Sequence, residues 1–207
     1  MKRCPQHKFF VLTKQAQNMA THVGLVYKKE ALGRAMGFWS HVYLGISVTD
    51  QADLDRMLPD FLQVPGKKWI SYEPAMGHVT FSNLDQISWL VCGGVSGPGS
   101  KPMSVEWARS VRDQCIETKI PFYMKQWGEW IPMGQCLADG REVIAAMQKG
   151  NGSYFHLAYV DVVGRETDFE GPAAYQTYEF HGGASAYRVG AKKAGNLLDG
   201  RKWEELP

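Results

Sequence analysis

Short apolar runs alternate with amphipathic stretches over the first two thirds of the chain. Five of these runs are rich in β-branched or aromatic residues and are bounded by Gly, Pro or polar residues: Phe9–Leu12, Val42–Val48, Trp69–Tyr72, Trp89–Cys92 and Pro121–Met124. Runs of this length and composition are typical of strands that are buried on both faces of a sheet. We therefore predict five strands in this part of the chain.

Helical patterns separate these runs. Apolar residues recur at helical spacing over three stretches: 15–27, 53–64 and 104–118. The third begins with Ser104, a favourable N-cap residue, and carries Glu106 in its first turn. Alternation of strands and helices predicts an α/β fold with a parallel sheet, either open or closed into a barrel. The connection 74–86 departs from the alternation, and we predict a loop there with a short strand at Val79–Phe81.

The last third of the chain has a different pattern, Gly-rich and mixed from Glu129 onward. It predicts a short helix near Arg141–Gln148, extended runs at Tyr154–Val163 and Gln176–Phe180, and a turn at Asp199-Gly200. We therefore expect residues 1–130 to form a partial (β/α) barrel core. Residues 131–207 are expected to form an irregular and antiparallel appendage that packs on this core.

Composition and charge narrow the class of protein. The chain has 207 residues, of which 44% are hydrophobic, enough for one full-sized domain with a sizeable core. The formal net charge is +2 and there is no run of Lys and Arg, so nucleic-acid binding is not indicated. No apolar stretch approaches the roughly 18–20 residues of a membrane span, and the basic start lacks the long apolar region of a signal peptide. We expect a cytoplasmic protein that does not bind membranes.

The cysteines and histidines do not show the spacing of a metal site. Cys4, Cys92, Cys115 and Cys136 are far apart in the sequence, whereas zinc and iron–sulfur sites usually take thiolates in close pairs. Cys92 and Cys115 lie within apolar patterns and are predicted to be core residues. The six histidines are scattered and are given no chemical role. We therefore expect no metal or cofactor site made by this chain alone.

Candidate functional residues follow the predicted strands. In parallel α/β sheets, functional groups gather at the carboxyl ends of the strands. Lys14 follows the first strand, Glu73 the third, and Lys125, Gln126 and Trp127 end the fifth. We expect these residues at one edge of the sheet, with Glu73 and Lys125 as catalytic candidates and the other three binding a ligand. Such a mixture suits a small anionic or aromatic ligand.

Each of these candidates also has a structural interpretation. Glu73 is a possible partner of Lys14 or Lys125 in an ion pair at the sheet edge. Trp127, like the nearby Trp130, is of a type that often covers the core near a strand end rather than stacking on a ligand.

A glycine-rich segment follows the fourth predicted strand. It contains Gly93, Gly94, Ser96, Gly97 and Gly99, all ahead of the predicted helix over 104–118. Backbone N–H groups near a helix start can hold a phosphate or carboxylate, so these residues are further ligand-binding candidates. The alternative is a tight turn whose backbone angles require glycine.

Several motifs, taken in order, resemble those of an uncharacterised family of phage and prophage proteins. The stretches that carry the resemblance are Pro5–Lys14, Ile70–Pro74, Gly93–Gly99, Arg112–Cys115, Pro121–Phe122, Lys125–Trp130 and Leu198–Arg201. The resemblance extends over about Pro5–Pro207 and is weakest between Gly134 and Gly183. It implies a radical-SAM-like protein with a partial TIM barrel. Members of the family commonly have Glu where this chain has Val95.

The resemblance implies a cofactor that these residues do not themselves provide for. In the family, an N-terminal cysteine motif would bind a [4Fe–4S] cluster and S-adenosylmethionine, and that motif would lie before residue 1 here. We expect cluster and S-adenosylmethionine only when an N-terminal segment or partner polypeptide is supplied. The chain would then be the C-terminal, substrate-side portion of a radical-SAM-type enzyme.

The sequence also leaves open a function without catalysis, and it suggests that the chain associates with a partner. The alternative function is that of a non-catalytic phage accessory protein, which binds an anionic or aromatic ligand or a host partner. In either case, absent barrel strands would leave a sheet edge uncovered, which favours self-association or a partner.

Overall fold

The chain folds as an α/β protein in the computed structural model, which describes residues 1, 3–32, 39–149, 154–160, 166–167 and 175–207. One five-stranded parallel sheet has its strands in chain order: β1 (Phe9–Thr13), β2 (Val42–Val48), β3 (Lys67–Tyr72), β4 (Trp89–Gly93) and β5 (Phe122–Gln126). The predicted fold class and all five predicted strands are confirmed.

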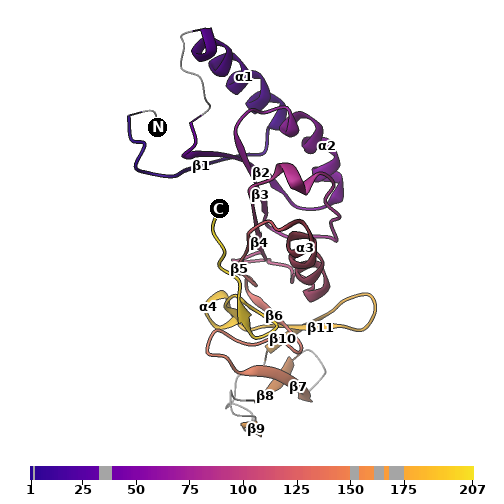
Figure 1. Cartoon of the computed structure of the whole chain (residues 1–207). Helices are drawn as coiled ribbons and strands as arrows, with labels where there is room; N and C mark the ends of the chain where they lie inside the picture. Colours follow the sequence, from indigo (N-terminus) through magenta and orange to yellow (C-terminus); the bar gives the residue numbers. More distant parts are fainter. Residues whose placement is uncertain (2, 33–38, 150–153, 161–165, 168–174) are drawn as a thin grey trace.

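Three helices cover one face of this sheet (Figure 1). They are α1 (Ala16–Leu32), α2 (Gln51–Leu62) and α3 (Val105–Thr118). Right-handed crossovers between strands in sequential order place every connecting helix on the same side, as in a (β/α) barrel and unlike a doubly wound sheet. The sheet therefore has one face covered by helices and one inner face, as expected for part of a barrel.

The helix starts follow the sequence signals. Ser104 caps α3, with its hydroxyl accepting a hydrogen bond from the Glu106 amide, as predicted. The short strand predicted at Val79–Phe81 is wrong. The amides of Thr80 and Phe81 are bound by the side chains of Gln51 and Gln114 instead of a neighbouring strand. The connection contains a short 3₁₀ helix at Leu84–Gln86.

Alternate residues of the strands face away from the helices. We call this side of the sheet the open face. Its amino-terminal half carries the rings of Phe10, Tyr43, Trp69, Trp89 and Tyr123, which contact one another; Trp69 and Trp89, for example, lie 5.3 Å apart between ring centroids. Phe10 is 40% exposed, so the open face is not completely covered.

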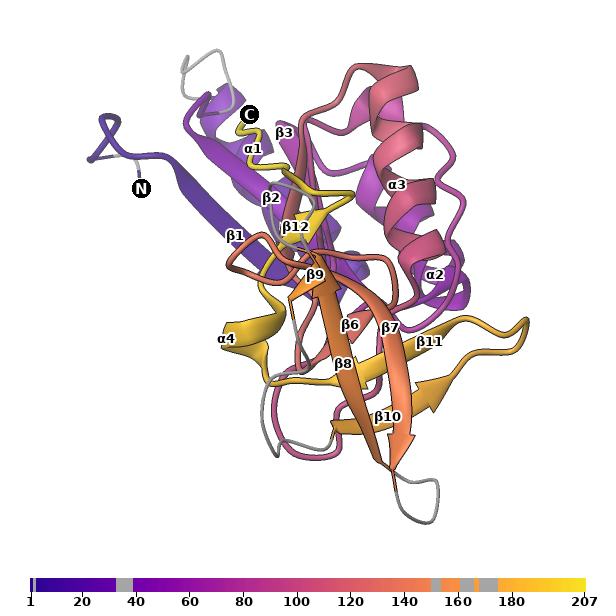
Figure 2. The ribbon, with the colours of Figure 1, turned by 90° about the horizontal axis from the view of Figure 1, so that it is seen from below.

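The end of the chain crosses the open face (Figures 1 and 2). The amide of Met124 in β5 donates to the Trp203 carbonyl at 2.8 Å, so the last residues lie along the outer edge of β5. The Trp89 indole N–H donates to the Glu205 carbonyl at 2.8 Å, and Lys8 Nζ donates to Pro207 O at 2.6 Å. The tail therefore spans from β5 toward the start of β1.

The appendage is built on an antiparallel sheet of order β6-β11-β10-β8-β7, with β9 beside β8. Its elements are β6 (Trp130–Pro132), β7 (Glu142–Lys149), β8 (Tyr154–Val160), β9 (Glu166–Thr167), β10 (Tyr175–Glu179) and β11 (Ser185–Arg188), followed by α4 (Ala191–Ala194), β12 (Leu197–Leu198) and β13 (Arg201–Lys202). Ile131, Tyr187, Leu198 and Trp203 belong to the same hydrophobic core as the helix face of the parallel sheet. The appendage therefore packs on the barrel-like part.

The sequence pattern predicted part of this appendage. The helix predicted near Arg141–Gln148 is wrong, because this stretch pairs antiparallel with β8 along its length as β7. The extended run predicted from Tyr154 is strand β8, and residues 161–163 of that prediction lie outside the described residues. The run Gln176–Phe180 corresponds to β10, and Asp199-Gly200 forms the turn between β12 and β13. Among the described residues, no helix is both long and apolar enough to cross a membrane.

Candidate functional site

Glu73 and Lys125 form an ion pair on the open face, at the carboxyl edge of the sheet. Lys125 Nζ lies 2.8 Å from Glu73 Oε2. Glu73 directly follows β3 and Lys125 lies in β5, so the two side chains meet across β4, the strand between them. The Glu73 side chain is only 15% exposed, whereas that of Lys125 is 55% exposed. The ion pair predicted between these residues is confirmed.

Gly93 explains how the pair can span β4. It lies in β4 between the two side chains, and a Cβ atom built there would be 3.1 Å from Glu73 Oε2. Contacts this short are tighter than ordinary van der Waals packing, so a larger residue would displace the carboxylate. Gly93 therefore leaves the room in which Glu73 and Lys125 meet.

Two serines extend this polar layer across the neighbouring strands. Ser71 Oγ donates to Glu73 Oε1 at 3.3 Å, and Ser47 Oγ donates to the Glu73 backbone carbonyl at 3.0 Å. Ser47 and Ser71 are register partners in β2 and β3, and both are buried. They hold the backbone and carboxylate of Glu73 in place, while the peptide bond from Glu73 to Pro74 is cis.

This arrangement is suited to binding a ligand that carries both charges. The carboxylate of Glu73 accepts hydrogen bonds, and the ammonium of Lys125 binds anions. A zwitterionic ligand can replace each partner of the ion pair at no net change in charge, because its anion meets Lys125 and its cation meets Glu73. Lys125 is the exposed partner of the pair, whereas the Glu73 carboxylate is mostly buried and accepts a hydrogen bond from Ser71.

Lys14 lies apart from this pair. It follows β1 at the sheet edge, with β2 between it and β3. There it borders a separate hollow of about 330 Å³ between the start of α1 and the middle and end of α2, with Arg56, Met57 and Asp60 on the other side. The structure therefore does not bring Lys14 into the group formed by Glu73 and Lys125.

The glycines after β4 are needed where two loops approach each other closely. A Cβ atom at Gly94 would lie 2.1 Å from the Trp127 carbonyl oxygen, and one at Gly128 would lie 2.0 Å from that of Val95. Gly97 and Gly99 have positive φ angles of 94° and 72°. These close contacts and positive φ angles are those of a tight turn. They favour the interpretation of the segment as a turn that requires glycine.

Part of the predicted anion-binding loop is already engaged within the protein. The Gly94 amide donates to the Gln126 carbonyl at 2.9 Å, and the Gly97 amide donates to Glu129 Oε1 at 3.1 Å. A carboxylate of the chain itself thus binds the Gly97 amide, where we expected an external anion. Ser96 and Gly99 are exposed on the same loop.

Trp127 does not present a surface to a ligand, which corrects its predicted role. It is 0% exposed, and its indole N–H donates to the Leu197 carbonyl at 2.8 Å. Trp130 is similarly buried, and its indole N–H donates to the Ser100 carbonyl at 2.9 Å. Trp127 therefore belongs to the main hydrophobic core, and the Trp130 ring packs edge to face on Tyr178. Gln126 is half-buried. It is the register partner of Gly93, where the pairing of β4 and β5 shifts by one residue.

The described cysteines do not fit a cluster held by three thiolates. Cys92 and Cys115 are fully buried in the core, as predicted, whereas Cys4 and Cys136 are half-buried in other parts of the molecule. Burial raises the pKa of the Cys92 thiol well above its usual range and that of Cys115 to about 12. Within the described ranges, no three His, Cys, Asp or Glu residues gather as metal ligands. These residues therefore do not provide the cluster that the family resemblance implies.

Sequence reasoning missed the serines and the role of Gly93. Ser47 and Ser71 lie inside apolar runs, where a small hydroxyl residue gives no distinct signal. Alternation along each strand does place Ser71 and Glu73 on the same face, two residues apart. The pairing register that puts Ser47 beside Ser71 is a long-range property, and it is visible only in the folded sheet.

Comparison with known proteins gives a family but no characterised relative. No curated protein matches the chain. A family model described as "Protein of unknown function (DUF5131)" matches residues 1–207. Because this match spans every residue of the sequence, the chain belongs to the DUF5131 family.

Proposed function

We propose that the open face binds a small polar ligand between Glu73 and Lys125, and that the chain is the substrate-side part of a radical-SAM-type barrel enzyme. The observation that carries the binding proposal is the ion pair across Gly93, with its 2.8 Å separation and its unequal exposure. A largely buried carboxylate beside an exposed ammonium is suited to an aminocarboxylate. The ligand's carboxylate binds Lys125 and its ammonium group binds Glu73.

The radical-SAM part of the proposal rests on the resemblance and on the sheet. The sequential strand order, the helices on a single face and the inner face with polar groups at its carboxyl edge are features of a partial barrel. Thiolates for the cluster would come from a segment or polypeptide other than the residues described. We derive no reaction step through that cluster. A bacterial cytoplasmic location in a phage or prophage context is part of the same proposal.

A second candidate is a non-catalytic accessory protein with the same ligand site. It is favoured by the dispersed cysteines, two of which are locked in the core. Under this alternative, the chain binds an anionic or aromatic ligand by itself, and no iron is required.

S-adenosylmethionine carries an aminocarboxylate, so its binding tests the site. Isothermal titration would use protein isolated from cells that contain its native gene neighbourhood, with iron measured in the same samples. Wild-type protein should bind S-adenosylmethionine, and E73Q and K125M should each weaken binding about tenfold or more, because each leaves one ligand charge unpaired. K28M is the matched control, since Lys28 is an exposed lysine on α1.

The outcomes separate the two candidates. Binding that appears together with iron supports the substrate-side portion of a radical-SAM-type enzyme. Binding without iron supports the accessory protein. Equal dissociation constants for K125M and K28M would reject the Glu73–Lys125 site in both cases.

A further inference from the structure

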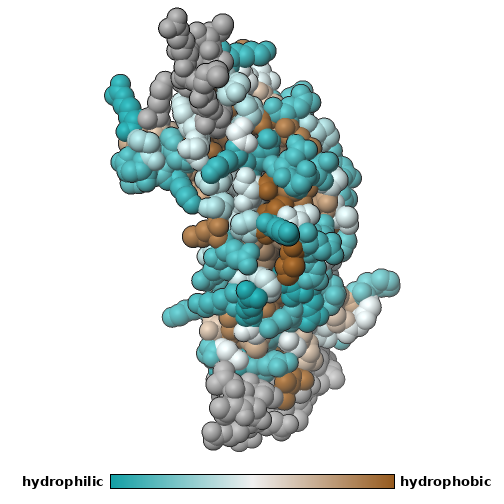
Figure 3. Space-filling model, in the orientation of Figure 1, coloured by the Kyte–Doolittle hydropathy of each residue, from teal (hydrophilic) through white to brown (hydrophobic). Residues whose placement is uncertain are grey.

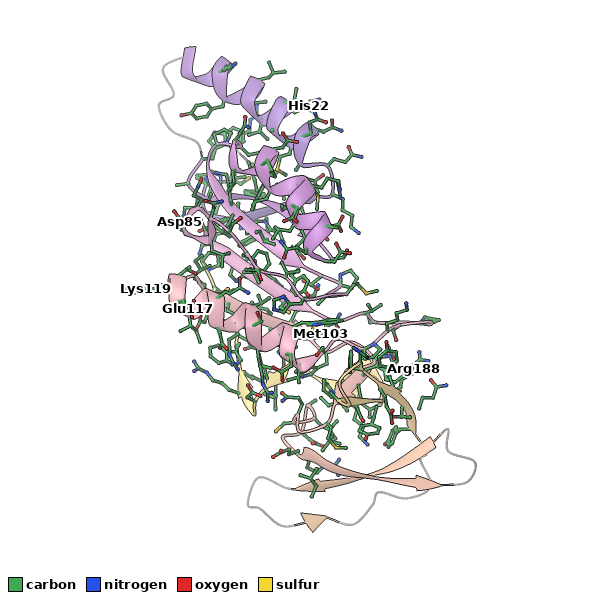
Figure 4. All side chains as sticks on the ribbon, turned by 90° about the vertical axis from the view of Figure 1, so that its right-hand side faces the viewer. His22, Asp85, Met103, Glu117, Lys119 and Arg188 are labelled. Atoms are coloured by element: carbon green, nitrogen blue, oxygen red, sulfur yellow. The ribbon has the colours of Figure 1, made fainter. Side chains whose placement is uncertain are left out.

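A second cavity lies outside the open face, between the start of α3 and the β10–β11 hairpin. Its volume is about 380 Å³, and its walls include Met76, Lys101, Trp107, Tyr178, Phe180 and His181. In Figure 4, Met103 marks this end of α3 and Arg188 lies nearby on β11, while Glu117 and Lys119 mark the far end of the helix. Neither Glu73 nor Lys125 lines this cavity.

Three aromatic rings form one wall. The Phe180 ring meets Trp107 edge to face, with centroids 6.0 Å apart, and meets Tyr178 in the same way at 5.0 Å. Tyr178 remains 41% exposed although its ring already has this neighbour. Exposed aromatic surface in a concave site provides a platform on which a flat ring can stack.

The hairpin that carries Phe180 is fixed by its own turn. The Phe180 amide donates to the Ala184 carbonyl at 2.8 Å, and the Gly183 amide donates to the Phe180 carbonyl at 3.0 Å. Gly182 and Gly183 have positive φ angles of 108° and 87°, which other residues adopt with strain. The aromatic wall is therefore preformed.

Two basic side chains lie at the mouth of the cavity. Lys101 and His181 are both exposed, and among the described residues neither is paired with a carboxylate. The nearest acidic residue on the first turn of α3, Glu106, already pairs with Arg109 at 2.9 Å. The backbone on either side of Lys101 is held in place. The Ser100 carbonyl accepts a hydrogen bond from the Trp130 indole, and Pro102 is buried. Among the residues that the structure describes, the Lys101 ammonium is therefore not paired with a carboxylate.

We propose that this cavity binds a nucleoside monophosphate. The base would stack against the aromatic wall formed by Trp107, Tyr178 and Phe180, and the phosphate would bind Lys101 and His181. Ligand sites for small molecules range from about 300 to 1,000 Å³, so a cavity of about 380 Å³ suits one nucleotide rather than two. The proposal is independent of the ligand at Glu73 and Lys125.

Calorimetric titration with AMP, adenosine and inorganic phosphate tests both halves of this site. AMP should bind more tightly than either adenosine or phosphate, since only AMP offers a ring and an anion together. K101M should weaken AMP binding about tenfold, while adenosine binding is unchanged. Y178A should weaken AMP and adenosine alike. K28M should bind AMP as the wild type does, and because Lys101 is exposed, K101M is expected to fold normally.

Three results would overturn the proposal. The first is no detectable AMP binding at concentrations up to about 10 mM, beyond the range of weak specific sites. The second is an equal AMP dissociation constant for K101M and K28M. The third is that E73Q loses AMP binding while K101M binds AMP as tightly as the wild type. That result would assign the nucleotide to the open face instead.

Discussion

Arg109 binds both carboxylate oxygens of Asp199 and thereby joins α3 to the turn between β12 and β13. Its Nη2 lies 2.7 Å from Asp199 Oδ1, and its Nε lies 3.2 Å from Oδ2. Arg112 Nη1 adds a contact of 2.5 Å, and Gln135 Nε2 donates at 3.0 Å. These donors hold the pKa of Asp199 well below its usual range, against the opposing effect of burial. Asp199 thus connects the appendage to the barrel-like part.

We expect D199N to destabilise the protein by about 1–2 kcal/mol at neutral pH. The expected loss is small because these groups are partly exposed, and exposed ion pairs contribute little to the free energy of unfolding. Asp199 has a φ of 52°, and asparagine adopts positive φ readily, so this substitution removes the charge while keeping the turn. Urea unfolding of wild type and D199N at neutral pH measures the difference.

The difference in stability between wild type and D199N should depend on pH in a definite direction. A carboxyl whose pKa is lowered by folding stabilises the protein fully above its unfolded pKa of about 3.9. This contribution is lost as the pH falls through the lower, folded pKa. The stability difference between wild type and D199N should therefore be constant above about pH 5 and shrink below about pH 4. A difference that grows on acidification would contradict the role of Asp199.

Gly45 is predicted to be intolerant of even one methyl group. A Cβ atom there would lie 2.4 Å from Trp69 Nε1, and Trp69 is only 7% exposed. The ring would have to shift within a packed aromatic cluster, so we expect G45A to lower the free energy of unfolding by about 1–3 kcal/mol. G45A/W69F, with a smaller ring, should recover part of the loss.

Gly24 provides the matched control for this substitution. It lies in α1, and a Cβ atom there would have nothing within 4 Å. G24A should stabilise the protein by about 0.5–1 kcal/mol, because alanine favours the helix. Chemical denaturation of the three variants gives the values; a G45A protein as stable as G24A would show that Trp69 does not pack on Gly45.

Thiol reactivity distinguishes the four cysteines. Cys4 and Cys136 are half-buried, whereas Cys92 and Cys115 are 0% exposed and have raised pKa values. We expect two thiols to react with an aromatic disulfide reagent in the native protein and all four in denaturant. Burial also raises the pKa of Cys136, so this thiol should react more slowly than it does in denaturant. Rapid native reaction of three or four thiols would contradict the packing of the core.

The surface seen in the orientation of Figure 1 is mainly hydrophilic, with local apolar patches (Figure 3). Sequence periodicity predicted the strands and helices beneath it, because burial between helices and neighbouring strands leaves continuous apolar runs such as Val42–Val48. The antiparallel strand Glu142–Lys149 escaped prediction because its sequence, EVIAAMQK, is rich in residues that also favour helices. Its pairing with β8 outweighs that local preference.

The candidate site was predictable only in part. Glu73 and Lys125 were found because strand ends are visible in the sequence. Their contact depends on Gly93, and no local pattern reveals that a glycine on one strand leaves room for side chains from two others. Lys14 was grouped with them because it also follows a strand, but the sheet order places β2 between it and Glu73. Trp127 was a candidate by residue type, and its burial is a property of the appendage packing above it.

Glu73 and Lys125 should matter more for binding than for folding. Lys125 is 55% exposed, and ion pairs with one exposed partner contribute about 0–1 kcal/mol to stability. K125M should therefore unfold within about 1 kcal/mol of the wild-type protein, and K28M should do the same. A large loss of stability in K125M would instead identify the pair as a structural ion pair.

The most direct test is the dissociation constant of S-adenosylmethionine for wild type, E73Q, K125M and K28M, each isolated from cells that contain the native gene neighbourhood. The free energies of unfolding are measured on the same samples. The account predicts binding at least about tenfold weaker in E73Q and K125M, with K28M unchanged and K125M as stable as the wild type. Wild-type protein that does not bind S-adenosylmethionine, or four variants that bind it equally, would contradict the proposed site.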